Sequence, residues 1–535
     1  MTADDDSRIP AGIDATERVR AMFRQYGPNY RWWVTAVAML GGFATLLTGT
    51  IINVAIPDIM GSLGMTPEEA QWLSTGFLAS TTVTMLLAAW AIETFGMART
   101  FIASMTIFLI GSIMGGIATS GEALIVARIV QGAGTGLMTP VSMLIIFQVF
   151  PVHRRGSAMG IQSVGMILAP AIGPALGGWL IDNFDWRYVF LLAIPFVMVS
   201  LPLALLFMPD READARSPKF DWTGVVLLTV FLASLLILLS NGEKYGWEST
   251  FVAAYLLVTL TSGIAFLYWE TYVSDPMFNL ELFRSVPFAA ASVVTFILGA
   301  GLYGSTYLVP LFLQLVQGLT PTDSGVLMIP AGLAMAAMSP LAGRLSDTLP
   351  PRNLILLGLS IFGVSSLLFS QVDLNTPVVD MLTWALIGRI GMAIVFPSLT
   401  TTSLRPLPLH LLAQGSGAIN FLRQLGGAFG VNLLTILQQQ RTHFHVDALT
   451  VAQQPGMTAT TELLHRVSEM AASGGVVAPY SSASAMSVLA TMLYGQGSML
   501  AFRDSFLAVA VVFFVCLVPV LFMENPQPAA GPTRQ

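Results

Sequence analysis

The sequence holds only one cysteine, Cys516, among 535 residues. One thiol excludes an intramolecular disulfide and any metal site built from several cysteines. Charged residues make up 10% of the chain, whereas soluble globular proteins carry about 25%. The net charge of −6 is too small to indicate a nucleic-acid partner. This composition is not that of a soluble domain.

Other signatures are also missing. No GxxxxGK[ST] pattern occurs, so ATP is not the expected energy source. Residues 1–32 begin with an acidic run and lack an apolar core with a cleavage site, so we expect a cytosolic tail, with a short surface helix over 16–26, rather than a signal peptide. Among the five histidines, His443, His445 and His465 lack ligand spacing, and surface histidines are favoured over a metal site. No metal, cofactor or enzymatic centre is expected.

What the chain does contain is apolar sequence. Hydrophobic residues make up 54% of it, and the mean hydropathy is +0.73. Apolar runs of roughly 20 residues recur from Trp33 to Phe522, each long enough to cross a hydrocarbon core of about 30 Å as a helix. The expected fold class is an all-α membrane protein with about fourteen transmembrane helices. These spans are expected near 33–57, 70–92, 100–119, 123–149, 157–181, 187–208, 222–240, 250–270, 287–313, 324–343, 353–371, 379–400, 412–437 and 500–523.

Lysine and arginine residues indicate the orientation of these spans. With both chain ends on one side, 16 of the 24 Lys and Arg residues fall on that side, five on the other and three within spans. By the positive-inside rule, both termini are expected to be cytosolic in a bacterial inner membrane. The outer connection 438–499 has apolar residues at helical spacing over 459–472, which predicts a periplasmic helix or helical hairpin.

Two stretches of the chain resemble each other. Around Arg128 the sequence is LIVARIVQGAGTGLMTPVSML, followed by a basic loop and a span that begins at Gly156, 28 residues later. Around Arg389 it is ALIGRIGMAIVFPSLTTTSL, followed by a loop and a span that begins at Gly415, 26 residues later. This similarity predicts two duplicated halves of six helices, with two further spans between them. Repeated halves around a central site are typical of transporters.

The fifth expected span contains APAIGPALGGWL, residues 169–180. Ala169, Gly173 and Gly177 recur every four residues, so one helix face is nearly free of side chains and a neighbouring helix can approach closely. The two prolines between them remove backbone donors and are expected to bend the helix. Taken alone, the stretch also fits ordinary small-residue packing.

Together these motifs resemble the major facilitator superfamily, in particular its fourteen-helix drug:proton antiporters of the EmrB/QacA type and EmrB-like proteins of Gram-negative bacteria. The sequence GPALGG (173–178) is similar to the fifth-helix motif of exporters, and ARIVQGAGTGL (127–137) to the fourth-helix motif. TIINVAIPDI (50–59) resembles the first-helix motif, and GRLSDTLPPR (343–352) the loop motif after the second helix of a half. The resemblance implies gating or packing roles for Gly173, Pro174, Gly177, Gly178, Gly343, Asp347 and Arg352.

The resemblance covers residues 33–523 and implies a major facilitator fold of two six-helix bundles plus two extra helices. The implied domains are a cytosolic tail (1–32), an N-terminal bundle (33–208), two inserted helices with linkers (209–285), a C-terminal bundle (286–523, including the periplasmic loop 438–499) and a second cytosolic tail (524–535).

Two departures from the family pattern matter. The first-half copy of the loop motif, AAWAIETFGMAR (88–99), keeps Glu93 and Gly96 but lacks the leading glycine and a basic residue, so gating is expected to depend more on Asp347. The family usually has an Asp, a leading candidate for the proton carrier, where this chain has Thr48.

Because this chain lacks that Asp, other residues must couple proton binding to transport. Asp58 and Arg128 both fall in the outer third of their spans. We expect them to meet there and to link proton binding to movement.

The middle of the expected bundle is cationic. No Asp or Glu lies near the middle of a span, whereas Arg389 and Arg423 each lie about ten residues, or roughly 15 Å, from a span end. If they face a cavity, they favour an anionic amphiphile over a lipophilic cation. Alternatively, backbone carbonyls and amides such as Asn420 or Gln424 neutralise them. The further cavity candidates are Asn53, Trp72, Gln131, Gln162, Tyr303, Tyr307, Gln314, Phe396 and Asn420, and for the aromatic ones core packing or lipid contact is an equal alternative.

The expected function is a proton-coupled multidrug efflux transporter that exports small amphipathic compounds by alternating access. The runner-up is a dedicated exporter of one metabolite, such as a fatty acid, siderophore or antibiotic. A membrane-embedded enzyme is disfavoured, because no cluster of histidines or carboxylates appears at one face. A channel is also disfavoured, and it would show flux that does not depend on a pH gradient. The resemblance also implies a periplasmic adaptor protein and an outer-membrane channel as partners.

Overall fold

The computed structural model describes residues 17–209, 219–453, 458–473 and 480–523. Throughout these ranges the chain forms helices and turns and no strand. The helices are α1 (Glu17–Tyr26), α2 (Tyr30–Leu63), α3 (Pro67–Phe95), α4 (Met97–Gly116), α5 (Gly121–Val149), η2 (Val152–Arg154), α6 (Arg155–Asn183), α7 (Tyr188–Leu191), α8 (Ile194–Phe207), α9 (Trp222–Tyr245), α10 (Thr250–Glu270), η3 (Leu280–Arg284), α11 (Val286–Leu315), α12 (Pro321–Thr348), α13 (Pro351–Phe369), α14 (Val378–Leu404), η4 (Leu409–Leu411), α15 (Leu412–Ala452), α16 (Thr458–Ser473), α17 (Tyr480–Val515) and α18 (Leu517–Val520).

Side-chain caps explain where several long helices begin. Thr66 accepts from the backbone N–H of Glu69, whose carboxylate accepts in return from the Thr66 N–H, and this capping box starts α3. Ser120 at the start of α5 and Thr320 at the start of α12 are simpler caps, in which the hydroxyl accepts from the backbone N–H three residues later. At the end of α3, Gly96 has φ +88°, a conformation that favours glycine, and α4 begins directly after it.

Thirteen of the described helical segments are long and apolar enough to cross a membrane. The expected span 412–437 is part of α15, which is more polar because it carries Arg423 and a run of glutamines at 438–440. It nevertheless packs lengthwise against α11, α17 and α3. The all-α membrane fold predicted from the sequence is therefore confirmed.

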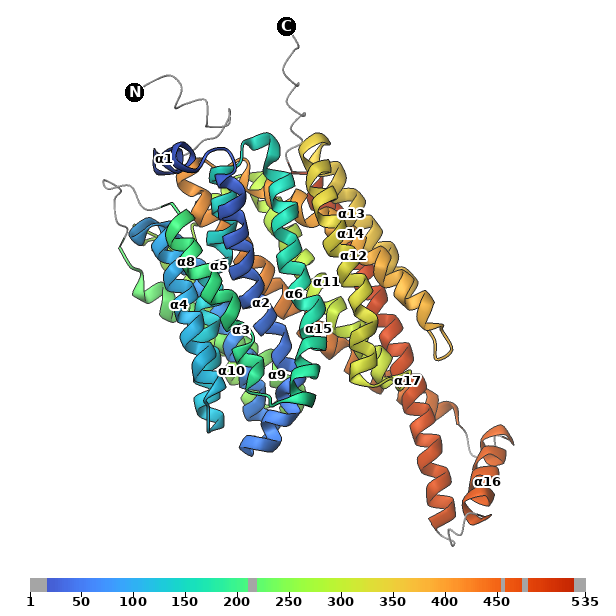
Figure 1. The fold of residues 1–535 in the computed structure, drawn as a ribbon. Coiled ribbons are helices and arrows are strands. Elements are labelled where there is room, and N and C mark those ends of the chain that lie inside the picture. Colours follow the sequence, from blue (N-terminus) through green and yellow to red (C-terminus); the bar gives the residue numbers. More distant parts are fainter. Residues whose placement is uncertain (1–16, 210–218, 454–457, 474–479, 524–535) are drawn as a thin grey trace.

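The helices form two bundles and an inserted hairpin. Helices α2 to α8 pack on one another, as do α11 to α18, while α9 and α10 pair and α9 also contacts α3 and α15. The two bundles meet mainly where α6 packs along α12 and where α3 and α5 pack along α15 (Figure 1). This arrangement places the interface between the bundles at the centre of the molecule.

Both ends of the described chain lie at the same end of the bundles. Phe369 stacks on Phe506 and Phe362 lies tilted against Phe513, with ring centroids 5.0 and 4.4 Å apart. Helix α17 therefore runs antiparallel to α13, and α18 reaches the start of α13. The start of α13 follows α12, whose last turn contacts the start of α6 beside η2. The start of α2 lies there too, since the Trp32 ring is 5.2 Å from that of Phe150.

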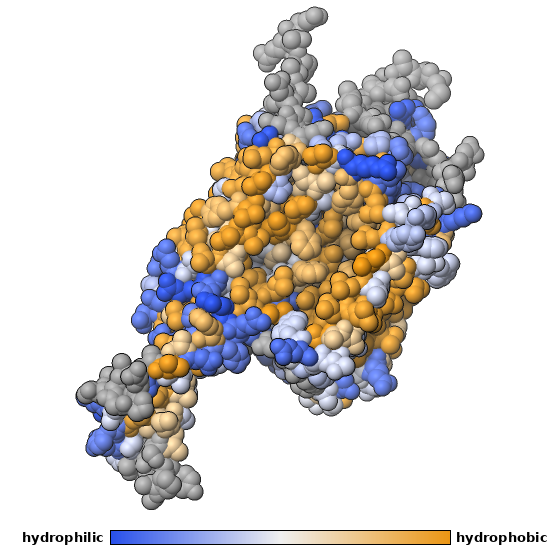
Figure 2. Space-filling model, turned by 180° about the vertical axis from the view of Figure 1, so that it is seen from behind, coloured by the Kyte–Doolittle hydropathy of each residue, from blue (hydrophilic) through white to orange (hydrophobic). Residues whose placement is uncertain are grey.

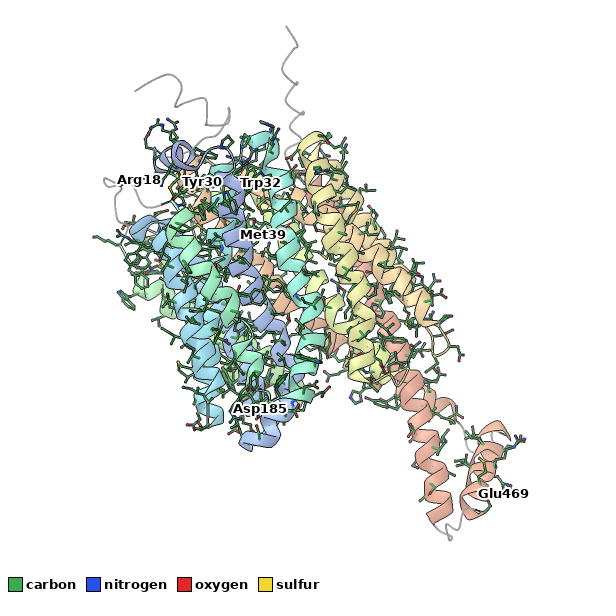
Figure 3. The ribbon with its side chains drawn as sticks, viewed as in Figure 1. Arg18, Tyr30, Trp32, Met39, Asp185 and Glu469 are labelled. Carbon is green, nitrogen blue, oxygen red and sulfur yellow. The ribbon has the colours of Figure 1, made fainter. Side chains whose placement is uncertain are left out.

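We name this end the Tyr30 end and the opposite one the Asp185 end, because Figure 3 labels both residues. Between them, Figure 2 shows a broad apolar surface over the bundles, with hydrophilic residues gathered toward the ends. A broad apolar surface with polar ends matches a lipid bilayer.

Beyond the Asp185 end, the chain forms a projecting arm. We use this name for the last turns of α15 from Arg441, for α16 and for the first turns of α17 up to Met499 (Figure 1). Helix α16 coincides with the helix predicted over 459–472 and packs on α17. The outer connection 438–499 is helical over most of its described length, because α15 and α17 continue as helices beyond their apolar parts and α16 lies between them. The polar turns at the end of α15 and at the start of α17 carry no hydropathy signal. The sequence therefore showed where the apolar runs end but not that the two helices continue beyond them.

Candidate transport site

Helix α6 uses one of its faces to pack inside its own bundle. A Cβ added at Gly173 would lie 2.7 Å from Thr50 Oγ1, and one at Gly177 would lie 2.5 Å from Ile51 Cγ1. Gly178, the next residue, points away from this face, and a Cβ there would meet nothing within 4 Å. The GPALGG stretch therefore lets α6 approach α2 closely, and its first and last glycines do not serve the same purpose.

Another face of α6 packs on the second bundle. A Cβ at Gly156 would lie 2.6 Å from the Gly343 carbonyl oxygen, and one at Gly160 would lie 2.4 Å from that of Ser339. Further along, a Cβ at Gly332 would lie 2.5 Å from that of Ala171. Backbones approach this closely only where side chains are missing, so glycines determine how tightly the bundles close at the Tyr30 end.

Asp347 joins the two bundles at this contact. Its carboxylate accepts hydrogen bonds from the Gly156 N–H at 2.7 Å, from the Ser157 N–H at 2.9 Å and from the Ser157 hydroxyl. These donors belong to the first turn of α6, where backbone N–H groups lack helical partners and favour negative charge. Arg352 lies half-buried at the start of α13, beyond this contact.

The eroded first-half motif makes no such contact among the described residues. Glu93 is half-buried at the end of α3, and its Oε1 has no hydrogen-bond partner there. Gly96 is used for the sharp turn between α3 and α4. The two motif copies therefore differ in what they bind.

A second contact between the bundles lies along α15. The Ser416 hydroxyl donates to the Pro140 carbonyl at 3.3 Å, and the Asn420 amide lies 3.3 Å from the Met143 sulfur. A Cβ at Gly417 would lie 3.1 Å from the Met85 carbonyl oxygen. The Tyr30 end is thus closed on both sides of the molecule in this conformation.

Arg423 lies one turn deeper along α15. Its guanidinium donates to the Asn420 side-chain oxygen and lies 4.9 Å from the centre of the Phe396 ring. Tyr303 of α11 donates to the neighbouring Gln424 at 3.4 Å. Arg423 thus contacts Asn420, one of the two amides named above as its alternative partner, and has an aromatic ring at its side.

Arg389 has a different environment. It donates to the Thr306 hydroxyl at 2.8 Å and lines a pocket inside the second bundle with Phe362, Ser365 and Phe506, among other residues. The pocket lies between α11, α13, α14 and α17 rather than along the contact with the first bundle. Arg389 and Arg423 are therefore not brought together on one surface by any contact of the described residues.

Arg128 is fully buried in the first bundle. Its Nε donates to the Leu73 carbonyl at 2.9 Å and its Nη1 to the Gln131 side chain at 3.0 Å, and its guanidinium lies 4.1 Å from the centre of the Phe77 ring. Gln131 in turn donates to the Ser112 hydroxyl at 2.8 Å. Carbonyls, an amide and an aromatic face thus surround the cation in place of a carboxylate.

The expected contact between Asp58 and Arg128 is not present in this conformation. Arg128 reaches α2 at the carbonyl of Thr48, 3.4 Å from Nη1, and ten helical residues, about 15 Å, separate that position from Asp58. Asp58 is exposed and, among the described residues, has no ion-pair partner. The sequence placed both residues in outer thirds of spans but could not show that the arginine side chain turns toward the middle of α2.

The other cavity candidates are dispersed. Gln314 donates to Ser324 at 2.9 Å between α11 and α12, and Gln162 is buried on α6. Trp72 is exposed, and Tyr307 is half-buried on α11. The side chains of Asn53 and Pro174 lie outside those that the structure describes.

One charged cluster was missed by the sequence analysis. Asp504 of α17 accepts from Arg441 Nε at 2.5 Å and lies 2.8 Å from His445 Nε2, both on α15. The spacing of Arg441 and His445, four residues apart, would have shown that they share a helix face. The partner acid lies 59 residues further on, which no local pattern reveals.

Comparisons with known proteins agree with this architecture. Residues 38–431 match the family model of the Major Facilitator Superfamily. The chain is 29% identical over 502 residues to the multidrug export protein EmrB of Escherichia coli (strain K12), covering 93% of this chain and 96% of EmrB. It is 32% identical over 429 residues to the uncharacterized MFS-type transporter YhcA of Bacillus subtilis (strain 168), covering 80% of each. It is also 29% identical over 421 residues to the lincomycin resistance protein LmrB of the same organism, covering 78% of this chain and 88% of LmrB.

Solved structures with the same fold include the human organic anion transporter MFSD10, with a TM-score of 0.60 at 13% identity over 92% of this chain and 99% of MFSD10. Another is the proton:xylose symporter XylE, with a TM-score of 0.58 at 13% identity over 91% of this chain and 96% of XylE. At such low identity they support the fold alone. The chain belongs to the Major Facilitator Superfamily, and it is a multi-pass membrane transporter related to the EmrB multidrug export proteins.

Proposed function

We propose that this protein is a proton-driven exporter of small amphipathic compounds across a bacterial inner membrane. The observation that carries the proposal is the closed contact between the bundles at the Tyr30 end, with Arg423 and Phe396 one turn deeper. Such a contact can open and close as a unit, which exposes a central site to one compartment at a time.

The Tyr30 end is proposed to face the cytosol. Exposed arginines gather there, including Arg18 and Arg20 of α1, Arg154 beside α6 and Arg344 of α12. The positive-inside rule assigns such an end to the cytosol. In this orientation the structure is closed to the cytosol, and the projecting arm lies in the periplasm.

The proposed substrate is an amphipathic compound with an acidic group. Arg423 provides a cation with an aromatic ring at its side, and no described acidic residue is paired with it. A carboxylate or sulfonate with an aromatic body matches both features. Since the guanidinium is held by Asn420, the site is preformed rather than assembled by the substrate.

Proton coupling is proposed to involve Arg128 and Asp58 as separate groups. Arg128 Nη2 is buried without a hydrogen-bond partner among the described residues, so a carboxylate or water can bind it when the helices move. Asp58 is exposed at the far end of α2, where it can exchange protons with solvent. A direct ion pair between them in this conformation is not part of the proposal.

The projecting arm is proposed to contact a periplasmic adaptor protein that leads to an outer-membrane channel. Helix α16 carries exposed Met470 and paired charges on its surface, and the arm stands clear of the bundles (Figure 1). EmrB-type proteins, which this chain resembles, work with such partners.

Transport into liposomes with an imposed pH gradient tests the proposal. Anilinonaphthalene sulfonate serves as the anionic probe and ethidium as the cationic one. We expect gradient-dependent export that is faster for the anion and is abolished by a protonophore. Export of neither probe, but of a single antibiotic or fatty acid, would favour the dedicated exporter. Flux that ignores the gradient would contradict proton coupling.

A further inference from the structure

Two acidic residues are buried at the Tyr30 end of the inserted hairpin. Asp221 precedes α9 and is 6% exposed, and Glu270 ends α10 and is 3% exposed. Neither has a lysine, arginine or histidine partner among the described residues. Two buried carboxylates without a cation are costly if both are charged.

Each carboxylate is fixed through one oxygen only. Asp221 Oδ1 accepts from the Gly224 N–H and from the Trp269 indole N–H, both at 2.8 Å. Glu270 Oε2 accepts from the Phe278 N–H at 3.0 Å. These donors hold the two side chains in place and leave the second oxygen of each for another partner.

The two remaining oxygens point to the same place. A Cβ added at Gly224 would lie 2.2 Å from Asp221 Oδ2 and 2.9 Å from Glu270 Oε1. Both oxygens are buried and have no hydrogen-bond partner among the described residues. Both oxygens therefore lie beside the same glycine without a donor, and a protonated carboxyl on either residue can donate where an ionised one cannot.

The charged groups around the pair do not supply a cation at this point. The adjoining pocket is lined by Glu93 of α3 and by Asp275 and Lys219 of the connections, while α15 contributes the uncharged Gln414. The Lys219 residue is exposed, and its backbone N–H donates to Asp275.

The charged residues of η3 do not provide a cation for the Asp221–Glu270 pair either. In η3, Glu281 and Arg284 are exposed and pair with each other. The described residues also contain no group of three or more His, Cys, Asp or Glu that could hold a metal ion. A proton therefore fits the pair better than a metal.

We propose that Asp221 and Glu270 form a proton-binding site, in which one hydrogen is shared between Oδ2 and Oε1. The proton comes from the solvent at the Tyr30 end and leaves to it, so no other reactant is needed. Two buried like charges beside one glycine do not both ionise easily, and binding of one proton removes the repulsion between them.

The site is connected to the contact between the bundles. Phe278, which donates to Glu270, packs on Phe421 of α15 with ring centroids 5.6 Å apart. The next residue, Asn279, donates to Gln414 near the start of α15 at 2.9 Å. While the proton is bound, the linker 271–279 is held to the hairpin and to α15 together.

Loss of the proton places two negative charges side by side. Their repulsion pushes Glu270 away and frees the Phe278 N–H. This linkage lies beside Glu93 of the first-half motif, which makes no contact like that of Asp347 among the described residues. The proton pair thus provides, on the α15 side, a pH-dependent counterpart of the Asp347 contact on the α12 side.

Hydrogen exchange on the unmodified protein tests the site without any substrate. We expect the protection factor of the linker amides 277–279, corrected for intrinsic exchange, to be constant at low pH. Once the pair titrates, protection should fall by roughly tenfold per pH unit, the slope for one linked proton. Protection that does not change with pH would overturn the proposal.

Two substitutions and a matched control identify the groups. Asp221→Asn supplies an N–H in place of the shared proton, so linker protection should become independent of pH. Glu270→Gln should also remove the pH dependence, and both variants should lose the infrared band of a protonated carboxylic acid. Glu281→Gln, an exposed acid in adjacent η3, should keep both signals. Retention of the band in both variants would assign the proton elsewhere, even if the export proposal held.

Discussion

Asp347 and Ser157 are joined by two hydrogen bonds, one from the Ser157 backbone N–H at 2.9 Å and one from its hydroxyl. The residues lie 190 positions apart and belong to different bundles. The carboxylate therefore caps a helix of the other half of the molecule, and its charge is matched to the partial positive charge of that helix end.

We expect Asp347→Asn to weaken closure at the Tyr30 end. Hydrogen bonds to a charged group contribute about 1.5–3 kcal/mol, so the closed population should fall by roughly tenfold or more. The measurement is the initial export rate of anilinonaphthalene sulfonate in liposomes, which should fall. Asp373→Asn, an exposed acid in the connection after α13, is the matched control and should transport normally. Equal rates in both variants would remove Asp347 from the gate.

Two glycines should respond oppositely to the same substitution. In Gly343→Ala the new Cβ would lie 2.3 Å from the Gly156 carbonyl oxygen, a backbone atom that cannot move aside without separating α6 from α12. In Gly178→Ala it would meet nothing within 4 Å. We expect the first variant to lose most transport and the second to keep it. Full activity of Gly343→Ala would mean that the close approach is not needed.

Arg423 should set the preference for anions. We expect Arg423→Gln to raise the KM for anilinonaphthalene sulfonate, by roughly tenfold if one charge-assisted hydrogen bond is lost, while ethidium is transported at least as well. Arg389→Gln changes an arginine inside the second bundle and should leave this preference unchanged. If the two variants exchange these effects, the substrate site lies in the Arg389 pocket.

How much of this was predictable depends on the kind of signal. Each apolar run reports its own helix, and the glycine pattern of α6 reports that a neighbour approaches closely. The sequence did not show that Gly173 and Gly177 face α2 while Gly156 and Gly160 face α12. A helix surrounded by apolar side chains and lipid has no polar face, so its sequence does not indicate which side is turned toward which neighbour.

Polar contacts between distant segments were the least predictable. Asp58 and Arg128 were paired from their depth in the membrane alone, and the structure shows the arginine on backbone carbonyls instead. Asp221 and Glu270 lie at span ends 49 residues apart, with no local pattern that links them. Only the fold shows that each places an unpartnered oxygen beside Gly224.

The projecting arm should depend on Asp504. In Asp504→Asn the ion pair with Arg441 and the contact with His445 are lost, and because the groups are partly exposed we expect a cost of only about 1 kcal/mol. Hydrogen exchange of residues 441–452 should accelerate, while exchange in α6 stays the same. Glu469→Gln on α16, an exposed acid paired with His465, is the control. Unchanged exchange in Asp504→Asn would show that helix packing alone holds the arm.

The distance between α6 and α12 at the Tyr30 end tests the central claim most directly. Spin labels on Arg154→Cys and Arg344→Cys, both exposed positions, in a Cys516→Ser background give this distance by double electron–electron resonance in nanodiscs. We predict a short distance that matches the closed contact and a second, longer one whose share grows in Asp347→Asn and changes with pH and with anilinonaphthalene sulfonate. One unchanging distance under all of these conditions would contradict alternating access through this contact.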